Sequence, residues 1–173
     1  MSTKTTRGFT LIELLVVIAI IGLLSSVVLA SVNTARGEAN DAKRVTDLRD
    51  VQTALELYAG DHNGSYPVGG AGASRWAGQC ANAAGLAQNA VITGLVPTYI
   101  PSLPADPEMN TTANTCCYLY ISDGASNYDF MDYNCPTANV LNPNLRSLLD
   151  TLFNGTPGNN PASWSVNTGY AGW

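Results

Sequence analysis

The residues from Phe9 to Val32 form an apolar run that contains a single charged side chain, Glu13. As a helix rising about 1.5 Å per residue, this run is about 36 Å long, which exceeds the ~30 Å hydrocarbon core of a bilayer. A lone carboxylate in hydrocarbon costs about 2.5 to 3.5 kcal/mol or more. The run therefore predicts a membrane-spanning helix in which Glu13 requires a partner.

The short segment before this run is polar and basic, with Lys4 and Arg7. Basic flanks stay on the cytoplasmic side of a membrane. Two interpretations follow. An ordinary secretory signal peptide would be cut after Ala30, before Ser31. The apolar run is longer than the ~7 to 15 apolar residues of a typical signal peptide, and it carries a charge. Both features favour a helix that is retained in the mature protein.

The stretch from Arg7 to Gly22, Arg-Gly-Phe-Thr-Leu-Ile-Glu-Leu-Leu-Val-Val-Ile-Ala-Ile-Ile-Gly, closely resembles the N-terminus of bacterial type IV pilins and type II secretion pseudopilins. The resemblance implies that prepilin peptidase cuts between Gly8 and Phe9 and that the new Phe9 amine is N-methylated. It also implies that Glu13 pairs with Phe9 of a neighbouring subunit in a homopolymer extracted from the membrane by an inner-membrane assembly machinery.

The chemistry of the first turn agrees with that implication. Cleavage would create a cationic amine at Phe9, and a helix places residues 9 and 13 on one face. The positive end of the helix dipole also favours a carboxylate in the first turn. In the alternative interpretation, Glu13 lies at the headgroup boundary and reaches water there.

Residues 33–59 are amphipathic. Their apolar side chains recur at spacings of three and four: Val45, Leu48, Val51, Leu55 and Tyr58. This spacing is typical of a helix with one buried face. Lys43 and Asp47 are four residues apart and can pair on another face. We expect one helix from about Phe9 to Ala59, ended by Gly60.

The remainder, 60–173, is expected to form a pilin-like globular domain, so the fold class is α+β: a long N-terminal helix on a small antiparallel sheet. Residues 116–121 and 128–133 are rich in β-formers and flank a turn, which predicts a hairpin. Alternation puts Cys117, Leu119 and Ile121 on one face, and we expect that face to pack on the helix.

The expected divisions of the chain are a leader at 1–8, a transmembrane half of the helix at 9–32, an amphipathic half at 33–59, a loop region at 60–115, the hairpin at 116–133 and a C-terminal region at 134–173. A short helix at 144–153 and an edge strand at 163–166 are predicted in the last region.

Four cysteines, Cys80, Cys116, Cys117 and Cys135, lie beyond the apolar run. An even count in an exported domain predicts two disulfides. A metal site is less favoured, since no C-x-x-C pair occurs. A bridge between the adjacent cysteines would be strained, which leaves two connectivities. The hairpin register favours Cys116–Cys135 with Cys80–Cys117.

The sequence gives little indication of a metal, cofactor, nucleic-acid or catalytic site. Asp123, Asp129 and Asp132 could supply oxygen ligands to calcium, but a hydrated acidic turn explains them more simply. No other cofactor is expected. The formal charge of −5 becomes −7 when Lys4 and Arg7 leave with the leader, which argues against nucleic-acid binding. The sequence shows no Ser/His/Asp set, P-loop or dinucleotide motif, so no enzymatic activity is expected.

We therefore expect a structural subunit of a type IV pilus-like filament, in the cytoplasmic membrane as a precursor and then outside the cell. A pseudopilin of a type II secretion system, with a periplasmic filament, is the first alternative. A monomeric binding protein, either membrane-anchored or secreted, is the second.

Overall fold

A computed structural model describes residues 9–133, 135 and 164–168 of the 173-residue chain. The leader, the predicted helix at 144–153 and most of the C-terminal region lie outside the described residues. The chain divides into two compact units, Met1–Arg36 and Gly37–Trp173. The fold class is α+β, as predicted.

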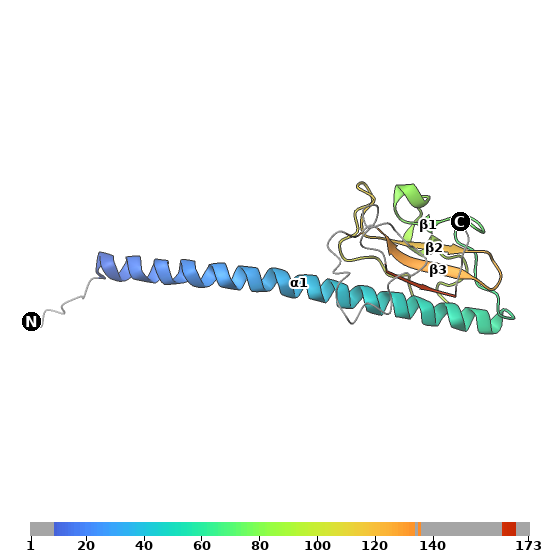
Figure 1. Ribbon diagram of the computed structural model, residues 1–173, viewed down its shortest axis with the longest axis horizontal. Coiled ribbons are helices and arrows are strands. Elements are labelled where there is room, and N and C mark those ends of the chain that lie inside the picture. The colour runs from blue at the N-terminus through green and yellow to red at the C-terminus, as the bar shows by residue number, and fades with distance from the viewer. Residues whose placement is uncertain (1–8, 134, 136–163, 169–173) are drawn as a thin grey trace, which may run out of the picture. The chain divides into compact units, whose positions relative to one another are not determined.

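One α-helix, α1, runs from Leu11 to Asp61 without interruption (Figure 1). Both of its ends lie two residues later than predicted. Gly60 does not end the helix; the chain instead leaves it at Asn63 and Gly64, whose φ angles of 56° and 83° are left-handed. The Gly64 N–H donates to the Ala59 carbonyl at 2.8 Å, so an orphan carbonyl of the last turn is satisfied by the turn itself.

The part of α1 in the first unit is long and apolar enough to cross a membrane, by its length and composition. Its large apolar side chains are exposed, among them Leu11 at 82% and Leu23 at 69%. Isolated apolar residues on a surface are ordinary, but a continuous apolar surface of this kind marks a membrane or protein contact.

The second unit contains a four-stranded antiparallel sheet in the order β1-β2-β3-β4. The strands are β1 (Ala77–Gly78), β2 (Cys117–Ser122), β3 (Tyr128–Tyr133) and β4 (Trp164–Asn167). Two short 3₁₀ helices, η1 (Ala81–Ala83) and η2 (Gln88–Ala90), lie in the loop region. The predicted hairpin is confirmed, with Cys117 opposite Tyr133 and Ser122 opposite Tyr128. The two-residue β1 was not predicted.

The face of the sheet that packs on α1 is the tyrosine face, so the expectation that Cys117, Leu119 and Ile121 would pack there was wrong. Tyr118 and Tyr120 share one buried cluster with Leu48, Val51 and Leu55 of α1. Their hydroxyls are satisfied inside the domain: Tyr118 donates to Asp47 at 2.9 Å and Tyr120 to the Pro67 carbonyl at 2.7 Å. A tyrosine can be buried when its hydroxyl finds such a partner.

The opposite face of the sheet carries a second, smaller cluster. Its members are Cys80, Ala83, Cys117, Leu119 and Met131. The sheet is thus buried on both sides, which explains why every residue of β2 is buried and why polar alternation could not identify the helix-facing side.

Leu55 and Leu57 test this packing within one helix, because Leu55 is fully buried and Leu57 is 56% exposed. Replacing Leu55 with Ala should lower the free energy of unfolding by about 2 to 5 kcal/mol, through lost burial and the cavity left behind. The same change at Leu57 should alter it by less than about 0.5 kcal/mol. Denaturant unfolding of the full chain in detergent measures both, and equal losses would contradict this packing.

Candidate processing and assembly site

Glu13 lies in the first turn of α1 and hydrogen-bonds to Thr10, the residue just before the helix. The carboxylate oxygen Oε2 accepts hydrogen bonds from the Thr10 backbone N–H at 2.8 Å and from its hydroxyl at 2.7 Å. The Glu13 N–H donates to Thr10 Oγ1 at 3.3 Å. This reciprocal arrangement is a capping box, and it starts the helix at Leu11.

Sequence reasoning missed this role, although the Thr-x-x-Glu spacing before an apolar run is its known signature. Phe9 is 79% exposed, while Gly8 lies outside the described residues. Within the described part of the chain, the hydrogen bonds of the Glu13 carboxylate go to Thr10. The carboxylate therefore receives hydrogen-bond donors from its own chain.

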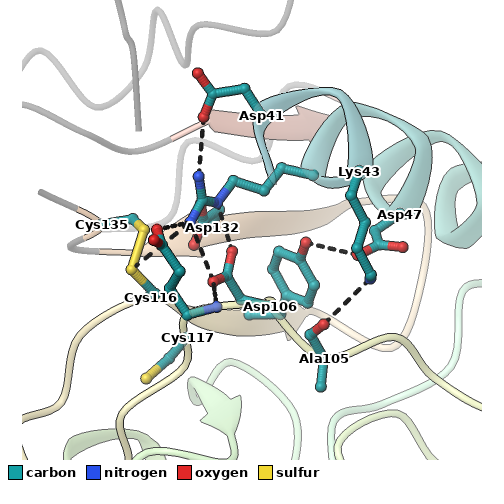
Figure 2. Close-up of polar contacts among 12 residues, drawn as sticks. Asp41, Lys43, Asp47, Ala105, Asp106, Cys116, Cys117, Asp132 and Cys135 are labelled. Atoms are coloured by element: carbon teal, nitrogen blue, oxygen red, sulfur yellow. Dashed lines mark hydrogen bonds and ion pairs between the residues drawn. A yellow bond between two sulfur atoms is a disulfide. The ribbon is translucent and has the colours of Figure 1, made fainter. Parts of the chain in front are cut away.

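A second group of charges lies inside the domain, around Arg44 of α1. The guanidinium donates two hydrogen bonds to the Asp106 carboxylate, from Nε at 2.6 Å and from Nη2 at 3.2 Å. Nη1 donates to Asp41 at 2.9 Å and Nη2 to Glu108 at 2.8 Å, and Asp132 Oδ2 lies 3.4 Å from Nε. Arg44 is fully buried. Figure 2 shows Asp41, Asp106 and Asp132 converging there from three segments of the chain.

The surroundings shift the protonation equilibria of this ion cluster, defined as Arg44 with Asp41, Asp106, Glu108 and Asp132. Burial, and then the charge of Asp106, raise the pKa of Asp132 well above its ordinary range. Burial acts to lower the pKa of Arg44, but hydrogen bonds to Asp106 and Glu108 outweigh it and raise that pKa. One permanently charged guanidinium thus donates hydrogen bonds to Asp41, Asp106 and Glu108, while burial favours the neutral form of Asp132 beside it.

The ion cluster was not predicted. The sequence held two signals: Arg44 lies one turn before Leu48 on the apolar face of the helix, and Asp41 lies three residues earlier on the same face. Its partners Asp106 and Glu108 are more than 60 residues away, so local spacing could not identify them. The predicted pair of Lys43 with Asp47 is confirmed at 2.5 Å.

The three acids proposed as calcium ligands are not brought together. Asp123 accepts hydrogen bonds within the hairpin turn, from Ala125 N at 2.7 Å and Asn127 Nδ2 at 2.8 Å. Asp132 faces Arg44, and strand alternation places Asp129 on the other face of β3. Calcium binding by this set stays a prediction.

The favoured disulfide pairing is confirmed: Cys80 joins Cys117, and Cys116 joins Cys135. The Asp106 carboxylate lies near the second bond, with its oxygen and both sulfurs within 4.8 Å of one another. Sulfurs that are joined in a disulfide are not thiolates, which are the form that binds metals.

Arg44 and Arg49 allow a matched test of the ion cluster. Replacing buried Arg44 with Met should lower the free energy of unfolding by about 3 to 5 kcal/mol, because it leaves buried carboxylates without their cation. Replacing exposed Arg49 with Met should cost less than about 0.5 kcal/mol. A loss below about 1 kcal/mol for the Arg44 variant in denaturant unfolding would contradict the cluster's structural role.

Asp123 should make the hairpin turn sensitive to acid. Burial acts to raise its pKa, but hydrogen bonds from Asn127 and Ala125 outweigh it and lower that pKa. A lowered pKa in the folded state stabilises the domain above about pH 3.9, the unfolded value, and this contribution is lost as the pH falls through the folded value.

Replacing Asp123 with Ala should therefore cost about 1 kcal/mol at pH 7 and progressively less below pH ~4. Thermal unfolding of both chains across this range measures the difference, and exposed Asp50→Ala is the control. A deficit that stays constant down to pH ~2 would show that the charge of Asp123 is not what stabilises the turn.

Comparison with known proteins places these features in a family. The prokaryotic N-terminal methylation motif matches residues 3–29. Type II secretion system core protein G of Escherichia coli strain K12 is 37% identical over 106 residues, which are 61% of this chain and 69% of that protein. Type IV wide pilus major component PilA4 of Thermus thermophilus is 43% identical over 60 residues, 35% of this chain and 46% of that protein.

Type II secretion system core protein G of Vibrio cholerae is 39% identical over 61 residues, 35% of this chain and 41% of that protein. The chain thus spans more than two thirds of the Escherichia coli relative but less than half of the other two. No solved structure matches. With its methylation motif, long apolar helix and α+β domain, the chain belongs to the pilin-like family of filament subunits that includes type II secretion system core protein G.

Proposed function

We propose that the chain is a structural subunit of a type IV pilus-like filament, cut by prepilin peptidase between Gly8 and Phe9 and polymerised through α1. The observation that carries this proposal is the exposed apolar surface of α1 with one carboxylate, Glu13, in its first turn. Lipid can cover that surface in the precursor, and the helices of neighbouring subunits can cover it in a filament.

The capping box explains how Glu13 is hydrogen-bonded before the leader is cleaved. Thr10 supplies donors to Glu13 while residue 9 is still in peptide linkage, so the precursor carries no unpaired carboxylate in the membrane. Cleavage creates a cationic amine at Phe9. A charged donor outcompetes neutral ones, so Glu13 would exchange Thr10 for the Phe9 amine of a neighbouring subunit.

Two kinds of filament are compatible with this mechanism: a surface pilus, and a pseudopilus of a type II secretion system located in the periplasm. The relatives include proteins named for each. In both, the precursor resides in the cytoplasmic membrane and an inner-membrane machinery extracts it. The role is structural in either case, and we propose no enzymatic activity.

The mature N-terminus separates filament subunits from the rival classes. We expect the mass of the mature protein to correspond to a chain that starts at N-methylated Phe9. A start at Ser31 would instead identify a secreted binding protein and contradict the filament proposal. An intact N-terminal Met1 would indicate a membrane-anchored protein that is not processed.

The assembly role of Glu13 can be separated from its capping role. Replacing Glu13 with Gln keeps a side-chain oxygen that can accept from Thr10 but removes the charge. We expect Glu13→Gln and Glu13→Ala both to abolish filaments, counted by electron microscopy, while cleavage at Gly8 continues. Exposed Glu38→Gln is the matched control and should form normal numbers of filaments. Normal filaments from Glu13→Gln would show that capping alone suffices.

A further inference from the structure

In the second unit, one face of α1 is covered by the domain and the opposite face is exposed. Leu48, Val51 and Leu55 lie in the buried cluster that contains the tyrosines of β2. The exposed residues on the other side of the helix, which we call the outer face, are Ala42, Thr46, Arg49, Asp50, Thr53 and Leu57. The outer face is therefore open to contact with another molecule.

The two charges of the outer face have no counter-ion within their own helix. Residues three and four apart are neighbours on a helix surface. No residue at those distances from Arg49 is acidic, and none at those distances from Asp50 is basic. In the described part of the chain neither residue makes an ion pair, whereas Lys43, one turn earlier, pairs with Asp47. Arg49 and Asp50 thus stay available to charges from outside the chain.

The side chains between these charges are small, and their donors are already used. Thr46 donates its hydroxyl hydrogen to the Ala42 carbonyl at 3.0 Å, and Thr53 donates its own to the Arg49 carbonyl at 2.9 Å. Leu57, which is 56% exposed, adds an apolar side chain to the same face. Small residues let the backbone of a second helix approach closely. The outer face therefore suits another helix with complementary charges.

Arg49 and Asp50 lie on the two edges of the outer face. Consecutive residues of an α-helix are separated by about 100° around the axis and by about 1.5 Å along it. Between parallel copies of α1 at similar heights, the Arg49 edge of one copy can therefore meet the Asp50 edge of the next. This contact uses different edges of the two copies, so it can repeat from copy to copy, as in an open filament.

We propose that the outer face docks a second, parallel copy of this chain, with Arg49 of one copy paired to Asp50 of the next. The inference rests on the proposed function, because copies of α1 that leave one membrane in the same orientation run parallel. An exposed ion pair adds little affinity, but like charges placed opposite each other are excluded. The pair would therefore set the register of neighbouring subunits outside the membrane-spanning half of α1.

Charge-swap variants test this pairing in filaments counted by electron microscopy. Arg49→Asp alone and Asp50→Arg alone should each reduce the number of filaments at least about tenfold, since each places like charges opposite one another. The Arg49→Asp/Asp50→Arg variant restores opposite charges and should come within about twofold of the wild-type number. Exposed Arg75→Asp, outside α1, makes the same change in net charge as Arg49→Asp and should leave the number unchanged.

A zero-length cross-link identifies the contact directly. Arg49→Lys keeps a cation at this position, and a carbodiimide joins an amine to a carboxylate only where the two groups touch. Treated filaments of this variant should give covalent dimers and larger species, with the amide between positions 49 and 50 of different chains found by mass spectrometry. The Arg49→Lys/Asp50→Asn variant should lack that amide, because it lacks the carboxylate.

Three outcomes would overturn the inference. Normal filament numbers from Arg49→Asp, with none from Glu13→Gln, would refute docking through the outer face and leave the proposed function intact. Treated Arg49→Lys filaments without the amide between chains would show that solvent or a different protein covers this face. A wild-type chain that forms no filaments would overturn both this inference and the proposed function.

Discussion

A carboxylate in an apolar helix must have hydrogen-bond donors, and the function proposed for this chain depends on how Glu13 obtains them. Thr10 supplies them in the precursor through the capping box that starts α1. The apolar side chains of α1 that follow Glu13 are exposed, and exposure of such a surface to water is unfavourable. Lipid, or the helices of other copies of the chain, can cover it. In the proposed function, membrane insertion and polymerisation both use this segment.

The domain also contains a charged group in apolar surroundings, in this case a cation. Arg44 is a buried cation that donates hydrogen bonds to Asp41 of α1 and to Asp106 and Glu108 from a distant loop, and Asp132 of β3 lies beside it. Such a cluster adds little net stability over apolar packing, but it requires all three segments to be in place at once. The disulfides and the tyrosine face of the sheet then hold a loop-rich chain on the helix.

Features set by local spacing were predictable from the sequence. The long helix, the hairpin and the cysteine pairing follow from periodicity, turn residues and strand register, and the N-terminal motif identified the family. Features set by contacts between distant segments were not predictable: Asp106 meets Arg44 across 62 residues. The helix-facing side of β2 was predicted wrongly because both faces are buried and the tyrosine hydroxyls find partners inside. The capping box was overlooked although its spacing was visible.

We propose that, on assembly, the Glu13 carboxylate exchanges its hydrogen bonds to Thr10 for an ion pair with the Phe9 amine of another subunit. Solid-state NMR on filaments mixed from two preparations tests it, one labelled with ¹⁵N at the Phe9 amine and the other with ¹³C at the Glu13 carboxylate. We expect the Phe9 nitrogen of one subunit to lie within about 4 Å of the Glu13 carboxylate of another, the range of an ion pair. Filaments in which the Glu13 carboxylate contacts only Thr10 of its own chain would contradict it.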